Sequence, residues 1–137
     1  MATTSSQISS LTTAQVAAIS ASDIPDLTVA QVGGLSATQI AALTTSQFQS
    51  MTTAQLAALT TSQISSIELA DLTALAANNN QIQSLNTSQV GALSSQQIST
   101  LFALSSLGLT SNQVGVLNSS HLSTLTGGQL NNLSSTQ

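Results

Sequence analysis

The stretch LTTSQFQSMTTAQLAALTTSQISS, residues 43–66, consists of three consecutive eight-residue units with one shared pattern. The same register extends back to Thr3 and onward through most of the chain, with the consensus L-[ST]-x-x-Q-[IVL]-x-x. A fixed short period of this kind is typical of repeat architectures. We therefore predict a single repeat array over residues 1–137, made of about seventeen octads. The positions of an octad are called slots one to eight, counted from the apolar residue before Ser or Thr.

Slots two and five of the octad predict the start of a helix. Ser or Thr followed three residues later by Gln is the capping box, in which the hydroxyl accepts from the N3 amide and the N3 side chain accepts from the N-cap amide. The apolar residues at slots one and six then form the hydrophobic staple that flanks such a cap. Each octad is therefore expected to begin a new short helix. The predicted capping residues are Thr12, Gln15, Thr28, Gln31, Ser36, Gln39, Thr44, Gln47, Thr52, Gln55, Thr60 and Gln63.

The period of eight favours an all-α solenoid of very short helices over other regular structures. In one continuous α-helix the apolar stripe would drift around the axis by about 80° per octad, so no partner could follow it. The alternative is a β-solenoid with sixteen-residue coils. Slots one and six are five residues apart, which would place them on opposite faces of a strand, and the chain has only seven Gly.

The two apolar slots of each octad are expected to line a narrow axial core. A single octad buries too little surface to offset its ordering entropy, so the array folds only by stacking. The predicted core residues are Leu11, Val16, Ile19, Ile24, Leu27, Val32, Leu35, Ile40, Leu43, Phe48, Met51, Leu56, Leu59, Ile64, Leu93 and Ile98.

Two units depart from the consensus. Residues 75–84 hold two additional residues and the run Asn78-Asn79-Asn80, and residues 101–108 place apolar residues outside the usual slots. The Asn run is either a binding loop or hinge, or a tolerated bulge between repeats, and the second interpretation is favoured because insertions in repeat arrays map to surface loops.

The composition excludes several classes of function. The chain has no Lys, Arg or Cys, only 3% charged residues and a net charge of −4. It therefore offers no basic surface for nucleic acid or anionic lipid, no disulfide framework and no Cys-based metal site. No segment has the length of apolar residues that membrane insertion requires, and the N-terminal residues do not form a signal peptide.

The few chemically capable residues occupy repeat slots. His121, Asp23 and Asp71 stand at slot five, and a lone His without a positioned partner predicts neither catalysis nor a metal site. The pairs Asp23/Asp26 and Glu68/Asp71 lack the oxygen-rich loop of a calcium site. We therefore predict no enzyme activity, no catalytic residue, no metal and no cofactor.

Units such as LTTAQVAA (11–18), LSATQIAA (35–42) and LTTAQLAA beginning at Thr52's neighbour Met51 as MTTAQLAA resemble the short tandem repeats of large, low-charge proteins that bacteria export or display. The resemblance implies an extracellular or cell-surface structural element, such as a filament subunit or an adhesin stalk. Because the array begins and ends without distinct capping repeats, it is expected either to be part of a longer array or to associate with itself, end to end or laterally.

A second hypothesis is a binding module for ice or polysaccharide. Its basis is the set of Thr doublets at slots two and three, of which Thr44-Thr45 and Thr60-Thr61 are examples. Two features weigh against it: slot-two Thr is already engaged as a cap, and slot three does not remain Thr along the chain.

Overall fold

The structure is a computed structural model that describes residues 5–103, 109–131 and 133. Within these ranges the chain forms short helices in series and no strand, which confirms the predicted all-α solenoid and shows the β-solenoid alternative to be wrong there. The elements are α1 (Ser5–Ser9), α2 (Thr13–Ala17), η1 (Ala21–Asp26), α3 (Val29–Gly33), α4 (Ala37–Ala41), α5 (Thr45–Ser50), α6 (Thr53–Ala57), α7 (Thr61–Ser65), α8 (Leu69–Ala76), α9 (Asn79–Gln83), α10 (Thr87–Gly91), α11 (Ser95–Phe102), α12 (Ser111–Gly115), α13 (Ser119–Ser123) and α14 (Gly127–Asn131).

The octad sequence determines where each helix begins and ends. In the octad of α6, Thr52 at slot two is the N-cap with extended backbone (φ −73°, ψ 159°), and the helix begins at slot three. Ala58 at slot eight is the C-cap and stays in the right-handed region (φ −86°, ψ −10°). The chain therefore turns through extended residues at slots one and two. No described residue has a positive φ, so these bends do not require Gly.

Octads with an altered cap have altered helices. Slot two is Ala76 in one irregular unit and Phe102 in the other, and neither side chain can accept a hydrogen bond from an amide. There α8 and α11 continue through slots one and two to a length of eight residues each. The expectation that every octad begins a new helix at slot three is therefore wrong at these two units. The remainder of the second unit, residues 104–108, lies outside the described residues.

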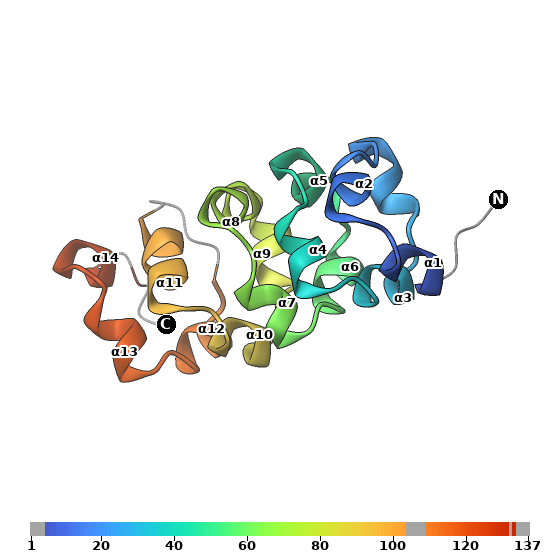
Figure 1. Cartoon of the computed structure of the whole chain (residues 1–137). Coiled ribbons are helices and arrows are strands. Elements are labelled where there is room, and N and C mark those ends of the chain that lie inside the picture. Colours follow the sequence, from blue (N-terminus) through green and yellow to red (C-terminus); the bar gives the residue numbers. More distant parts are fainter. Residues whose placement is uncertain (1–4, 104–108, 132, 134–137) are drawn as a thin grey trace.

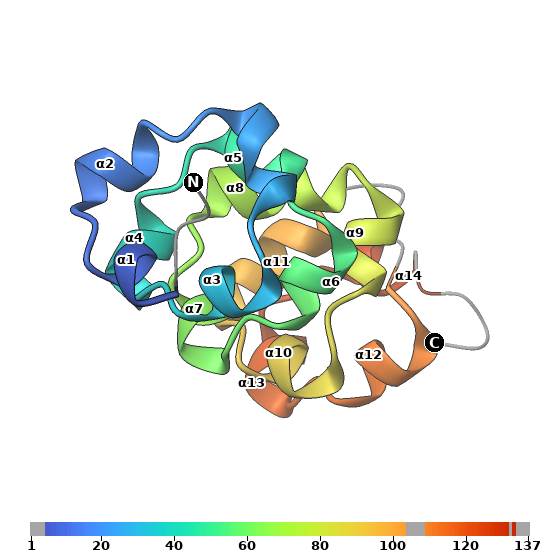
Figure 2. The same cartoon turned by 90° about the vertical axis from the view of Figure 1, so that its right-hand side faces the viewer.

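The helices wind into a superhelix with between three and four octads per turn. Helices three octads apart are in contact along the chain, as α3 with α6, α4 with α7 and α7 with α10. Figure 1 shows the elements following one another along the long axis, from α1 at one end to α14 at the other. Figure 2, which views the α1 end, shows the octads placed around a central axis.

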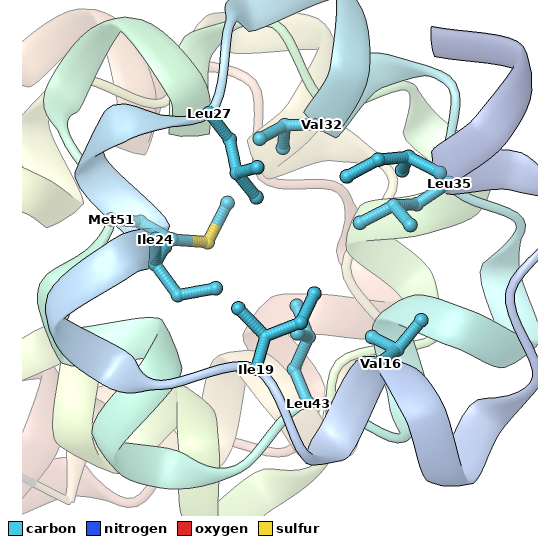
Figure 3. A pocket seen from close by; sticks show the side chains of 9 residues that line it. Val16, Ile19, Ile24, Leu27, Val32, Leu35, Leu43 and Met51 are labelled. Carbon is cyan, nitrogen blue, oxygen red and sulfur yellow. The ribbon is translucent and has the colours of Figure 1, made fainter. Parts of the chain in front are cut away.

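The apolar side chains of slots one and six form one continuous core around this axis. Most predicted core residues are buried, but Leu11, Ile19 and Leu27 are only partly buried, so their assignment to the core is corrected. They belong to the first turn of the superhelix, where no preceding turn covers slot one. Figure 3 shows side chains of the first two turns, including Ile24 and Met51, pointing toward one another around a cavity of about 10 Å³.

Replacement of Leu56 by Ala tests the axial core. Leu56 at slot six is 0% exposed, so truncation leaves a cavity and is expected to lower the free energy of unfolding by about 2–5 kcal/mol. Leu122 occupies the same slot but is 41% exposed, so Leu122→Ala should cost less than about 1 kcal/mol. Denaturant unfolding followed by circular dichroism measures both changes. Equal losses in the two variants would contradict an axial core at slot six.

Candidate functional site: the glutamines between turns

The side chain of Gln55 joins two turns of the superhelix. Its Oε1 accepts a hydrogen bond of 2.9 Å from the backbone amide of Thr52, which closes the capping box of α6. Its Nε2 donates to the carbonyl oxygens of Ile24 and Leu27, each at 2.8 Å, one turn earlier. The side chain is 1% exposed, so these bonds satisfy its amide inside the protein.

Seven other buried slot-five residues repeat this arrangement across the turns. Their Nε2 atoms donate to carbonyls at slots six and seven of an earlier octad or at slot one of the next. These carbonyls lie at the C-terminal end of a short helix, where the last C=O groups have no partner within the helix. The set, called the cross-turn glutamines, is Gln39, Gln47, Gln55, Gln63, Gln81, Gln89, Gln97 and Gln113.

One cross-turn glutamine therefore satisfies the ends of two helices. Its oxygen serves the N-terminus of its own helix, and its nitrogen serves the C-terminus of the helix one turn earlier. Gln81 is the exception at the first of these ends, because α9 is capped by Asn78, whose side chain accepts from the Asn80 amide. Gln81 still donates to Met51 at 2.9 Å.

The two additional residues at 75–84 do not disturb this register. Gln55 and Gln113 contact carbonyls 31 and 28 residues earlier, whereas Gln89, whose contact spans the insertion, reaches carbonyls 33 and 30 residues earlier. The increase of two in both spacings equals the insertion. Asn78 and Asn80 are exposed. The insertion is therefore accommodated at the surface while the turns above and below remain joined.

The donor role explains why slot five holds Gln and never Glu. A capping box accepts either residue, because only an acceptor is needed at the N-cap amide. A Glu carboxylate, however, has no donor and would place a second oxygen against two or three carbonyl oxygens in a buried site. Across the whole chain slot five is Gln in thirteen units and Glu in none.

All six predicted capping pairs form capping boxes in the structure. They are Thr12/Gln15, Thr28/Gln31, Ser36/Gln39, Thr44/Gln47, Thr52/Gln55 and Thr60/Gln63. The sequence did not indicate the second role of these glutamines, in bonding between turns. The complete preference for Gln over Glu at slot five is the signal that would have revealed it.

The two octads with Asp at slot five lack the capping box. Asp is one methylene shorter than Gln, and neither Ser20 in the octad of Asp23 nor Glu68 in that of Asp71 makes a side-chain cap. The first of these octads forms a 3₁₀-helix with Pro25 inside it. The helix N-terminus that sequence analysis expected for both carboxylates is present for Asp71 in the first turn of α8.

Asp71 is buried and replaces the cross-turn amide with a different contact. Its Oδ1 accepts a hydrogen bond of 2.7 Å from the Thr45 hydroxyl on α5. Burial raises the pKa of the Asp71 carboxyl above its ordinary value of 3.8, and the nearby Glu68 carboxylate adds to the rise, while the Thr45 hydrogen bond opposes it. This octad is therefore a weaker joint when the carboxyl is ionised.

His121 reproduces the glutamine arrangement with a ring. Its Nδ1 lies 3.3 Å from the amide of Asn118, and its Nε2 lies 2.8 Å from the carbonyl oxygen of Leu93. The amide can only donate and the carbonyl can only accept, so the geometry assigns the neutral tautomer with hydrogen on Nε2. Both ring nitrogens are thus engaged in the structure.

The described residues contain no group of three or more His, Asp or Glu side chains placed to hold a metal ion. No described helix has the length and apolar character needed to cross a membrane. The cavity in Figure 3 is lined by apolar side chains of the core and has about the volume of one water molecule. The polar groups of the interior therefore serve packing between turns.

Comparison with known proteins gives one match. The family model of the ALTTAQ repeat matches residues 16–53 and 64–106, which is more than half of the chain. The six letters of that name correspond to slot eight followed by slots one to five, as in residues 42–47, ALTTSQ. No curated protein and no solved structure matches the chain.

Replacement of Gln55 by Glu separates its two roles. Gln55→Glu keeps the acceptor of the capping box but places a carboxylate oxygen against the carbonyls of Ile24 and Leu27. We expect a loss of about 2–4 kcal/mol in the free energy of unfolding at pH 7. The control is Gln15→Glu, at an exposed slot five that makes only the capping box, with an expected change within about 0.5 kcal/mol. A neutral Gln55→Glu in denaturant unfolding would refute the cross-turn role.

The raised pKa of Asp71 predicts a stability that increases in mild acid. The folded protein binds the proton at higher pH than the unfolded chain, so the free energy of unfolding rises as pH falls toward 3.8. Asp71→Asn should abolish this rise, and Asp71→Gln should in addition stabilise the protein at pH 7 by about 1–3 kcal/mol. Thermal melts between pH 7 and pH 4, in about half-unit steps, measure the slope. The prediction fails if the Asp71→Asn variant retains the slope of the parent.

Proposed function

The chain belongs to the ALTTAQ repeat family, and from this membership and the packing of its octads we propose that it is a self-associating element of an extracellular bacterial filament, matrix or adhesin stalk. The coarser statement, that it is a structural repeat protein, follows from the family match and the fold. The observation that carries the proposal is the use of the buried glutamines: their amides bond helix to helix and turn to turn.

A superhelix built from one repeated joint suits an element whose task is to span distance. Each additional octad extends the axial core and contributes one more slot-five side chain to the previous turn. The stability of such an array is the sum of unit and interface contributions, so its length is not limited by a closed core. This supports a role as a spacer or filament.

The surface supports association with other copies. Four acidic residues are the only charged side chains in the sequence at neutral pH, which gives little electrostatic repulsion between copies. Exposed Ser and Thr hydroxyls cover slots two to four, as at Thr52, Thr53 and Thr61. The outer face is therefore polar without being strongly charged.

We propose no catalytic role and no role in binding ice. Both nitrogens of His121, the single His, already contact the backbone, so it is not poised as a base. The slot-two hydroxyls accept from backbone amides, as Thr44 does from Gln47 at 3.2 Å, which commits one position of each Thr doublet to capping. The surface localisation rests on the resemblance of the octads to exported repeats.

Self-association and location can be tested separately. Sedimentation velocity and negative-stain electron microscopy of the purified chain are expected to show large species and fibres that increase with concentration. Antibody labelling of intact producing cells is expected to detect the protein without permeabilisation, with a cytoplasmic protein as the control. A chain that stays monomeric at its highest soluble concentration contradicts the first expectation. Labelling that requires permeabilised cells contradicts the second.

A further inference from the structure

The two ends of the superhelix expose different halves of the joint between turns. At the first turn, slot-one residues Leu11, Ile19 and Leu27 are only partly buried, although slot one is buried in the following turns. At the other end, slot-six residues Leu122 and Leu130 are each 41% exposed, although slot six is fully buried inside the array. Figure 1 places these two sets at opposite ends of the molecule.

Hydrogen-bonding groups at the two ends are complementary as well. Gln15 is exposed, and its Oε1 closes the capping box, but no described carbonyl faces its Nε2 as Ile24 and Leu27 face that of Gln55. The carbonyls of Val114 and Leu117 occupy the acceptor positions of the joint, and no described slot-five side chain donates to them. One end thus offers donors and the other acceptors.

We define two faces from these residues. The first-turn face consists of Leu11, Gln15, Ile19 and Leu27. The last-turn face consists of Leu122, Leu130 and the carbonyls of Val114 and Leu117. Inside the array, groups of these same slots meet at every turn, with apolar side chains against apolar side chains and a Gln amide against carbonyls.

We infer that the first-turn face of one copy docks on the last-turn face of a second copy and continues the superhelix across the junction. This inference rests on the proposed function, since it names the partner and the surface through which self-association proceeds. The charges permit the contact. Asp23 and Asp26 lie near the first-turn face, whereas residues 109–131 contain no Asp or Glu, so no like charges oppose each other at the junction.

The geometry of the contact determines the assembly. The two faces are different surfaces of one chain, so the interface is heterologous and each bound copy presents a fresh last-turn face. Because the axis of the superhelix runs from one face to the other, addition proceeds along that axis. The expected product is an open linear fibre one superhelix wide, not a closed dimer.

The test uses two variants, each blocked at one face, and their mixture. Gln15→Glu places a carboxylate where an amide donor should meet carbonyls, and Leu122→Asn with Leu130→Asn removes the apolar surface of the other face. All three positions are exposed or half-exposed, so folding should persist, and circular dichroism checks this. In sedimentation equilibrium each variant alone should associate at least about tenfold more weakly than the parent chain.

Mixing the two variants is the decisive measurement. The last-turn face of Gln15→Glu and the first-turn face of the double variant are both intact, so the mixture should form a one-to-one dimer that neither variant forms alone. Val29→Asn, at an exposed slot-three residue outside both faces, is the control and should associate like the parent chain. Fibres in the parent chain that persist in both face variants, or a mixture that stays monomeric, would overturn the docking. A parent chain that never associates instead overturns the proposed function.

Discussion

A primary amide carries an acceptor on one side and donors on the other, and the superhelix uses both. The oxygen of each cross-turn glutamine faces the N-cap amide of its own helix, while its nitrogen faces carbonyls at the end of a helix one turn earlier. Helices of five residues leave most of their terminal groups without internal partners, and such helices are unstable alone. The amide supplies partners at both kinds of end, so short helices become stable only as members of adjacent turns.

The remaining features of the chain follow from this joint. The axial core needs two apolar side chains per octad, and the joint sets which of them face each other across a turn. Bends made by extended residues at slots one and two remove the need for Gly, which accords with only seven in the sequence. Where slot two cannot cap, at Ala76 and Phe102, the helix runs on until the chain finds another start.

Local chemistry was predictable from the sequence, and the arrangement of turns was not. Thr12 with Gln15 and Thr60 with Gln63 indicate the capping box because every atom of that motif lies within four residues. The partners of Gln55 at Ile24 and Leu27 lie about four octads away, and nothing in an array of equivalent octads marks which octad is the partner. The same reasoning explains why Leu11, Ile19 and Leu27 were expected in the core: their slot is a core slot, but their turn has no neighbour below. The departures at Asp23, Asp71 and His121 show how much the slot tolerates, since a ring with an acceptor and a donor fits the joint and a short carboxylate does not.

The equivalence of the octads also bears on how such a gene can change. If recombination removes or duplicates one whole octad, each slot-five glutamine beyond the change meets a new partner that offers the same carbonyls in the same places. The two-residue insertion at 75–84 shows that even an imperfect unit leaves the partners on either side in register. Heritable variation in length is therefore nearly free of structural penalty in this design, whereas variation in the identity of slot five is not.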